Sequence, residues 1–542
     1  MNRKPIAPVN HAQIENWTNP LLISFLVGEI ITILFKNSLT PLVFSGRSFS
    51  GRSLVFQVVV FLSLWLLDSA IVFAIIIALQ KILHKSFQLD PIVKLSTNHR
   101  IITIILIIGF GIAMIYFFNN VFPLIDTNTW KLNIYTPFPP GYPAGIDFRV
   151  GIYWPAEMIL NNQNIYIDAN SNLPIYTYSN YPPFVNVFFM PLQLLSENAA
   201  YVLFIFAILI SNIISLGLTS IIIKDIFFSR LGIERQYNMM LSLFLFFTML
   251  FYTLTSYSFL FSIERGNYDS IAFMFAVLSL YLMIKKPESL WLQVILLSIA
   301  THLKIYPAAL FLALFVKHGK KMLLPSLAIN TLFLLSLGFK NAYLFIGVII
   351  HYTLTPVNIW IGNHSGFSFA ELLYGAYPTL DTYISSLRLI FTIIPILIWA
   401  LSSLLIIKYH KNEMRSVYLL MVAVPLMCLI PTISHDYKLI ILSVSFLILL
   451  SILIIKIYRD SKFWDYFQLL LVIILALMIG RSYNVVPDAS LFFNNKYPTI
   501  LLLALLMTFN VMPIRGLTTE TPPIQDTLPL ISPNVPEGLL GY

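Results

Sequence analysis

One aspartate stands out in this sequence because the backbone around it is stiff. Asp147 lies in the stretch PFPPGYPAGIDFRVGIYWPAE, residues 137–157, with four prolines before it and three glycines around it. Proline fixes φ and Pro-Gly bends restrict the path of the chain, so the carboxylate can point in few directions. A carboxylate positioned in this way could take the proton of an attacking hydroxyl group. The alternative is a loop aspartate that caps the following turn.

Further polar motifs follow along the chain. They are Arg149 within GIDFR, Glu264, Arg265 and Asp269 in ERGNYDS, His302 and Lys304 in THLKIYP, Asn363 and His364 in GNHS, and His435, Asp436 and Lys438 in ISHDYK. Each has an ordinary explanation when taken alone, because cations at helix ends anchor membrane proteins and single histidines form surface hydrogen bonds. Asp269 could cap a helix, and NHS is a common chance glycosylation sequence. The motifs become significant only if they meet.

Together these motifs could hold a phosphate that is attached to a lipid. Arg265 lies just before a predicted helix start, where unpaired N–H groups and the helix dipole favour an anion. Lys304 and Lys438 could add positive charge to the same phosphate. Fixed cations stabilise the charge that develops on a phosphate leaving group. With Asp147 as the base, the set would support attack by a hydroxyl group and departure of a phosphate.

The composition is that of a membrane protein. Of 542 residues, 58% are hydrophobic and 11% are charged, whereas about a quarter are charged in a soluble domain. The net charge of +9 comes from basic residues near the ends of apolar runs, where they set membrane orientation, so we expect no nucleic-acid partner. The single cysteine, Cys428, excludes a disulfide framework and a cysteine metal site. The polar start shows no cleavage signature, which predicts that the first helix stays as an anchor.

Apolar runs recur from Leu21 to Met512 and predict about fourteen membrane crossings. They lie near residues 21–35, 54–79, 101–122, 200–223, 239–258, 270–284, 290–300, 305–316, 322–338, 386–407, 416–431, 437–456, 465–480 and 498–512. Basic residues occupy every second connection, which predicts that both termini are cytoplasmic and that the polar motifs face outward.

The runs near 290–300 and 305–316 are too short to span a bilayer singly. Lysines flank them on both sides, so we expect the chain to enter the membrane and return, with THLKIYP facing an outer cavity. Two long outer loops, about 123–199 and 339–385, contain apolar stretches that indicate interfacial helices. Residues 513–542 are rich in proline and predict a flexible cytoplasmic tail.

The order and predicted side of these motifs resemble the GT-C superfamily of integral-membrane glycosyltransferases. The stretch NYPPFVNVFFMPLQLL, then ERGNYDS, LKIYP, GNHS and PTISHDYK, is most similar to glycosyltransferase family 87, the polyprenyl-phosphate-mannose-dependent α-mannosyltransferases. The resemblance covers residues 101–512 and implies an all-α polytopic membrane protein, a GT-C-like transmembrane helix bundle. Residues 1–100 would form an N-terminal extension with two transmembrane helices, which the family pattern usually lacks.

The resemblance implies inverting transfer of a hexose, expected to be mannose, from a polyprenyl-phosphate sugar. The acceptor would be a hydroxyl group of a lipid or glycan on the outer face of a bacterial plasma membrane, and no metal or other cofactor is expected. Asp147 matches the general base of the first outer loop. By the same resemblance, the residues near the donor phosphate or sugar are Arg265, Lys304, His435 and Lys438, and those in contact with acceptor or donor are Asn363, His364 and Arg149.

Two acidic residues keep a different class of protein open. Glu29 and Asp68 lie in the middle of the first two predicted helices, where a charge costs at least a few kcal/mol. A proton-coupled transporter or lipid flippase would use such groups. Against this alternative, most other charges lie at helix ends, and no internal repeat relates two halves of the chain. A third possibility is a glycan polymerase or ligase with a similar outward-facing site.

Overall fold

The computed structural model describes the chain from residue 144 to residue 512 with a few gaps. The described segments are 144–167, 179–231, 235–354, 359–460, 463–481 and 491–512, together with single positions or short stretches between residues 24 and 118. These segments form helices and no strand, with one isolated bridge between Asn363 and His435. The expected all-α fold class is confirmed.

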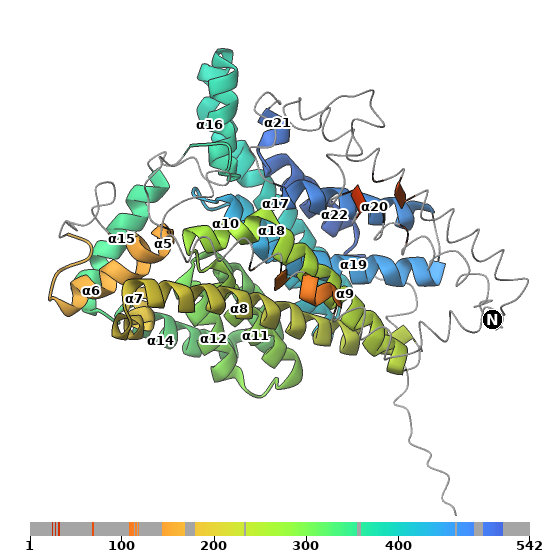
Figure 1. The fold of residues 1–542 in the computed structure, drawn as a ribbon, viewed down its shortest axis with the longest axis horizontal. Helices are drawn as coiled ribbons and strands as arrows, with labels where there is room; N and C mark the ends of the chain where they lie inside the picture. Colours follow the sequence, from red (N-terminus) through yellow and green to blue (C-terminus); the bar gives the residue numbers. More distant parts are fainter. Residues whose placement is uncertain are drawn as a thin grey trace, which may run out of the picture.

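Twelve helices of the described segments build the bundle (Figure 1). They are α8 (Glu197–Ile226), α9 (Arg235–Thr255), α10 (Tyr257–Arg265), α11 (Asp269–Lys285), α12 (Leu290–Leu303), α13 (Phe311–His318), α14 (Leu323–Leu334), α17 (Ile384–Tyr409), α18 (Asn412–Leu429), α19 (Leu442–Asp460), α20 (Phe463–Gly480) and α22 (Tyr497–Phe509). In Figure 1 the long helix α8 crosses in front of α11 and α12, and α8 and α11 are in contact.

The apolar runs predicted from residue 200 onward are all helical, but most of these helices are short. Four helices of the described segments are long and apolar enough to cross a membrane: Glu197–Ile226, Asn238–Thr255, Ile384–Tyr409 and Asp436–Ile457. The number rises to six if each of two bent helix pairs counts as one span. The other predicted runs of this part of the chain form helices shorter than that length, because apolar character fixes helix formation but not helix length. The count of about fourteen crossings for the whole chain stays a prediction.

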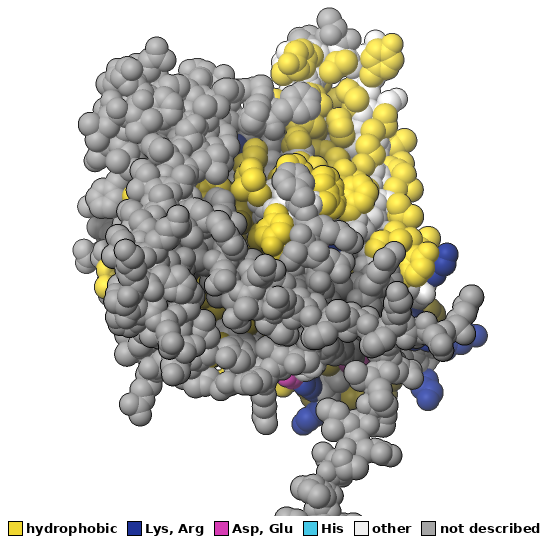
Figure 2. Space-filling model, turned by 90° about the vertical axis from the view of Figure 1, so that its right-hand side faces the viewer, with side chains coloured by type: hydrophobic (Ala, Val, Ile, Leu, Met, Phe, Trp, Pro, Cys, Tyr) yellow, Lys and Arg dark blue, Asp and Glu magenta, His cyan; other side chains and the backbone are white. Residues whose placement is uncertain are grey.

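The surface agrees with a lipid environment. Figure 2 shows hydrophobic side chains over much of the described part of one face, with most lysine and arginine side chains of that face lower down. Helix α17 illustrates the pattern, since Leu389, Leu397 and Leu404 are all at least 60% exposed along its length. Exposed leucines on one long apolar helix are expected where acyl chains replace water.

Both predicted outer loops contain helices. The first holds α5 (Ile146–Phe148), the π-helical turn η1 (Arg149–Tyr153), α6 (Trp154–Leu160), α7 (Pro183–Phe189) and η2 (Met190–Leu194). The second holds α15 (Gly338–Leu354) and α16 (Gly366–Ala376), and α16 projects from the body of the molecule in Figure 1. Two apolar stretches of the first loop, AEMILNN at residues 156–162 and VNVFFMPLQLLS at residues 185–196, correspond to α6 and to α7 with η2.

The two short runs form a pair of helices joined by a turn, and their entry into the membrane stays a prediction. Helix α12 ends at Leu303, the turn η4 (Tyr306–Leu310) follows, and α13 runs back. At the far end of the pair His318 Nε2 lies 2.7 Å from Gln293 Oε1. Lys304 belongs to the turn between the two helices. Its side chain reaches the start of α11, where Nζ is 3.8 Å from Asp269 Oδ1. The motif THLKIYP is thereby brought beside ERGNYDS.

A sharp bend positions ERGNYDS itself. Helices α10 and α11 meet at 112° across Gly266, Asn267 and Tyr268. Gly266 has φ +65°, a left-handed conformation that ends α10 as glycine commonly does. The bend leaves Arg265 at the end of one helix and Asp269 at the start of the next.

Some predictions concern residues outside the described segments. They include Glu29, most of the first three predicted helices, residues 137–143 and the tail 513–542. Asp68 is described, and it is buried with its Oδ2 accepting a 2.6 Å hydrogen bond from Thr32 Oγ1. This bond gives Asp68 a structural partner within the apolar helices.

Candidate active site

The segment that carries Asp147 is fastened to the end of α10. The backbone N–H of Gly145 donates a 2.7 Å hydrogen bond to the carbonyl of Glu264, and Tyr201 Oη donates to the carbonyl of Ile263 at 2.8 Å. A Cβ atom at Gly266 would lie 2.6 Å from the Cβ of Phe148, so only glycine allows this approach. The stiff loop therefore ends against the α10–α11 bend.

This contact places the Asp147 carboxylate between two side chains of ERGNYDS. Arg265 Nη2 forms an ion pair with Asp147 Oδ1, and Asn267 Nδ2 donates to Oδ2 at 3.1 Å. Asn267 Oδ1 in turn accepts the N–H of Asp269 at 3.1 Å, which ties the arrangement to the start of α11. Arg265, expected at the phosphate, is thus the residue that orients Asp147.

Lys304 lies in a cage of aromatic rings beside this group. Its Nζ is 4.3 Å from the ring centre of Tyr268 and 5.0 Å from that of Tyr181. Tyr306 Oη donates to Asp269 Oδ1 at 2.7 Å, which leaves the Asp269 carboxylate shared between Tyr306 and Lys304. Burial lowers the pKa of Lys304, but Asp269, Tyr181 and Asp147 together raise it above its ordinary value. Lys304 therefore remains a cation.

Lys438 reaches the same region from the ISHDYK motif. It is buried, its Nζ donates to the carbonyl of Ile433 at 3.1 Å, and it lies 5.0 Å from the ring centre of Tyr306. Lys304 and Lys438 are thus held near one tyrosine. The structure brings together Asp147, Arg265, Lys304 and Lys438, four of the residues selected from the sequence.

The GNHS and ISHDYK motifs pair with each other through their backbones. The N–H of His364 donates to the carbonyl of Ser434 at 2.9 Å, and the N–H of Asp436 donates to the carbonyl of Gly362 at 3.1 Å. Asn363 is fully buried, and its side chain donates to the carbonyl of Thr432 and accepts the N–H of Ser434, both at 3.0 Å. Asn363 therefore holds the two motifs together and is not positioned to contact a substrate.

His364 belongs to a buried group of charged residues behind this pairing. Its Nδ1 lies 3.5 Å from Asp436 Oδ1, and its Nε2 is 3.0 Å from Ser434 Oγ. Complete burial lowers the pKa of His364 to about 4, although Asp436 opposes the change. His364 is a neutral, buried hydrogen-bonding group at neutral pH.

Lys496 is a member of this group that the sequence reasoning missed. Its Nζ lies 3.1 Å from Asp436 Oδ2, and both side chains are 1% exposed. Burial lowers the pKa of Lys496 to about 8, and Asp436 limits the decrease. A signal was available, because this lysine lies in a predicted outer connection, where the positive-inside rule expects few basic residues.

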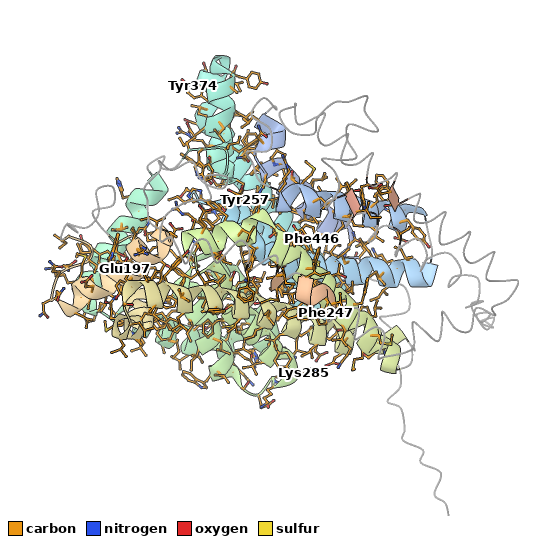
Figure 3. The ribbon with its side chains drawn as sticks, viewed as in Figure 1. Glu197, Phe247, Tyr257, Lys285, Tyr374 and Phe446 are labelled. Atoms are coloured by element: carbon orange, nitrogen blue, oxygen red, sulfur yellow. The ribbon has the colours of Figure 1, made fainter. Side chains whose placement is uncertain are left out.

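His435 and Arg149 take up different positions. His435 is 8% exposed, and its Nδ1 accepts a 3.0 Å hydrogen bond from Trp360 Nε1. Arg149 forms an ion pair with Glu197 and donates from Nε to the carbonyl of Ala144 at 2.9 Å. Arg149 therefore fixes the loop to the start of α8 and does not join Asp147, which lies on another face of the same helical turn. In Figure 3 Glu197 is labelled in the left part of the molecule.

The fold and this site define a polytopic α-helical membrane protein with buried charged residues gathered at helix ends around one oriented carboxylate. Residues 178–432 match the family model of glycosyltransferase family 87. The resemblance seen in the motifs is confirmed, and the match supports a GT-C-type glycosyltransferase. No curated protein and no solved structure matches the chain.

The matched range contains only part of the site. Arg265, Lys304 and His364 lie within residues 178–432, whereas Asp147 precedes that range and Lys438 and Lys496 follow it. The candidate base Asp147 and the cations Lys438 and Lys496 therefore lie outside the matched range and join the site through contacts in the described structure.

Proposed function

We propose that this glycosyltransferase moves a hexose, mannose by resemblance, from a polyprenyl-phosphate sugar to a hydroxyl group of a lipid or glycan. The observation that carries the proposal is the Asp147 carboxylate, oriented by Arg265 and Asn267 beside the buried Lys438 and the largely covered Lys304. A base and a cationic place for a leaving phosphate are the two requirements of such a transfer.

Asp147 would act on the acceptor. A carboxylate can accept about four hydrogen bonds, so the contacts with Arg265 and Asn267 leave room for an incoming hydroxyl group. In the proposed step the acceptor oxygen gives its proton to Asp147 and forms a bond to the anomeric carbon. The bond from that carbon to the phosphate oxygen breaks, and its electron pair leaves with the polyprenyl phosphate. Attack opposite the leaving group inverts the anomeric centre.

Lys304 and Lys438 would receive the charge that develops on the phosphate. Lys438 is buried and the Lys304 side chain is only 13% exposed, so their attraction for an anion is screened less than that of surface lysines. The aromatic rings around Lys304 hold its ammonium group in place without neutralising it. All these contributions come from side chains of the chain itself, and we expect no metal ion to be needed.

The site would face the non-cytoplasmic side. Helix α11 starts at Asp269 in the site and ends at Lys285, which pairs with Asp225. A second ion pair, Lys317 with Glu413 at 3.9 Å, joins the end of α13 to the start of α18. In Figure 3 Lys285 lies at one edge of the molecule and Tyr374 of α16 at the opposite edge. Basic residues favour the cytoplasmic side, so the end of α11 that carries Asp269 would be outside.

The proposal is tested with the purified full-length protein in liposomes. Labelled polyprenyl-phosphate mannose, polyprenyl-phosphate glucose and a nucleotide-diphosphate mannose are supplied with a membrane-lipid extract as acceptor. We expect label to move only from a polyprenyl-phosphate sugar. Transfer from the nucleotide sugar alone would contradict the donor class, and movement of unreacted lipid across the bilayer without transfer would favour the flippase.

A further inference from the structure

Trp360 and His435 form a close side-chain pair at the edge of the site. The indole Nε1 donates to His435 Nδ1 at 3.0 Å, and the two ring centres lie 5.3 Å apart. The indole folds over Gly362, where a Cβ atom would lie 2.2 Å from the Trp360 ring. The position of Trp360 is therefore set by its own turn and by its partner.

This bond determines where a neutral His435 carries its proton. An indole nitrogen can only donate, so Nδ1 of His435 must present its lone pair. The proton of a neutral imidazole then lies on Nε2. No residue of the described segments forms a hydrogen bond with Nε2, although the ring retains 8% exposure.

The surroundings keep His435 neutral. Burial lowers its pKa well below the ordinary value, and the positive charges of Arg265 and Lys438, the neighbouring His364 and then Lys304 lower it further. These groups come from α10, from the ISHDYK and GNHS motifs and from the turn after α12, and the uncharged ring of Tyr437 packs 5.4 Å away. A neutral His435 thus places an uncharged N–H donor among several cations.

We propose that Trp360 is a positioning residue that fixes His435 as the Nε2–H tautomer, and that His435 donates from Nε2 to a hydroxyl group of the donor sugar. The second part rests on the proposed function. In the proposed function the cations bind the anionic phosphate. A neutral N–H group of His435 is suited to an uncharged hydroxyl group of the sugar. Without the hydrogen bond from Trp360, the proton of His435 could occupy either ring nitrogen, and Nε2 would no longer always carry the N–H group.

The tautomer is tested directly by ¹⁵N NMR of the full-length protein labelled at its nine histidines. His435→Asn identifies the signals by difference. We expect one neutral histidine with a proton on Nε2 alone, and a mixture of tautomers in Trp360→Phe. A mixture in the unmodified protein, or no change in Trp360→Phe, would overturn the positioning role. This measurement needs no substrate, so it stands apart from the success or failure of the glycosyltransferase proposal.

Kinetics test the role toward the sugar. Trp360→Phe should lower kcat/KM for the donor about threefold to tenfold, the range for one hydrogen bond between neutral groups. The acidic limb of its pH profile should move to higher pH, because the lost N–H no longer opposes protonation of Nδ1. Trp464→Phe is the matched control, since Trp464 is 60% exposed on α20, and its kinetics should be unchanged.

Inhibition by sugar-free polyprenyl phosphate separates the two possible partners of His435. If Nε2 bonds to the sugar, Trp360→Phe leaves this inhibition constant as it was. An inhibition constant weakened as much as kcat/KM would overturn the assignment to the sugar and place the bond on the phosphate.

Discussion

The Nζ atom of Lys496 lies 3.1 Å from Oδ2 of Asp436, with both side chains almost fully buried. The two residues belong to different parts of the chain, the start of α22 and the ISHDYK motif that also supplies His435 and Lys438. Removing one member of a buried ion pair leaves the other charge uncompensated. The pair therefore supports the backbone that carries two candidate substrate contacts.

Lys496→Met and Asp436→Asn should each destabilise the fold by about 3 to 5 kcal/mol. The double variant should recover much of that loss, because it leaves no buried charge without its partner. Thermal unfolding in one detergent measures all three. The half-buried pair of Lys317 and Glu413 provides the control, and breaking it should cost at most about 1 kcal/mol. Equal effects at the two pairs would contradict the structural role of Lys496.

Asp147→Asn should reduce transfer about 10²- to 10⁴-fold, the contribution of a general base. The amide cannot take the proton of the acceptor, although its oxygen can still accept the bond from Asn267. Product formation with labelled donor measures the effect. Glu157→Gln, an exposed acidic residue of the same segment, should retain full activity. A folded and active Asp147→Asn variant would show that Asp147 is not the general base.

Lys304→Met should lower kcat/KM for the donor about 10- to 150-fold, as expected when a hydrogen bond from a charged group to phosphate is lost. Competition by sugar-free polyprenyl phosphate should weaken in parallel, because the lost contact is to the phosphate. Lys285→Met, at the far end of α11, is the control and should bind the donor normally. Unchanged competition in Lys304→Met would remove Lys304 from the phosphate site.

Gly266→Ala should impair both folding and activity, because the added Cβ would meet Phe148 at 2.6 Å and push back the segment that carries Asp147. Gly319→Ala tests a positive φ without crowding, since Gly319 has φ +61° and nothing within 4 Å, although its ψ is −144° where that of Gly266 is +40°. The control should lose about 1 to 3 kcal/mol of stability, the cost of a sparsely populated backbone conformation, and keep its activity. Comparable activity in the two variants would show that the Phe148 contact does not hold the base in place.

We expect the free energy of unfolding to fall in mild acid because of His364. Its pKa is about 4 in the fold and about 6.5 when unfolded, so below pH 6.5 the unfolded chain binds a proton that the folded chain excludes. Stability from this residue is complete above pH 6.5 and falls by about 3 kcal/mol as the pH drops to 4. His364→Gln should flatten the pH dependence of unfolding by that amount. Identical slopes for variant and parent would mean that His364 does not stay neutral.

The sequence predicted the site best where a motif is local. The loop with Asp147 and the bend with Arg265 are each recognisable from turn residues and charges, and the structure joins them. The direction of Arg149 was not predictable, because residues two apart on a helical turn point to different faces. Trp360 and His435 are 75 residues apart, and their contact depends on the pairing of GNHS with ISHDYK. Lys496 could have been suspected from its predicted side of the membrane, but its carboxylate partner required the fold.

Helix counting was less successful for a related reason. Apolar composition marks each segment correctly as a helix, yet it does not distinguish a span from a short helix buried by its neighbours. Helix α12 is only 14 residues long and ends just before Lys304, whose Nζ lies 3.8 Å from Asp269 Oδ1.

Lys496 lies at the start of the last described helix, so Asp436 gains its buried partner from a late part of the described chain. A chain that has inserted everything up to α20 already contains Asp147, Arg265, Lys304 and Lys438, but Asp436 still lacks its buried counter-charge. The site is completed only when α22 enters the bundle. A chain that stalls before α22 would therefore lack the buried partner of Asp436, and the backbone that carries His435 and Lys438 would lose that support.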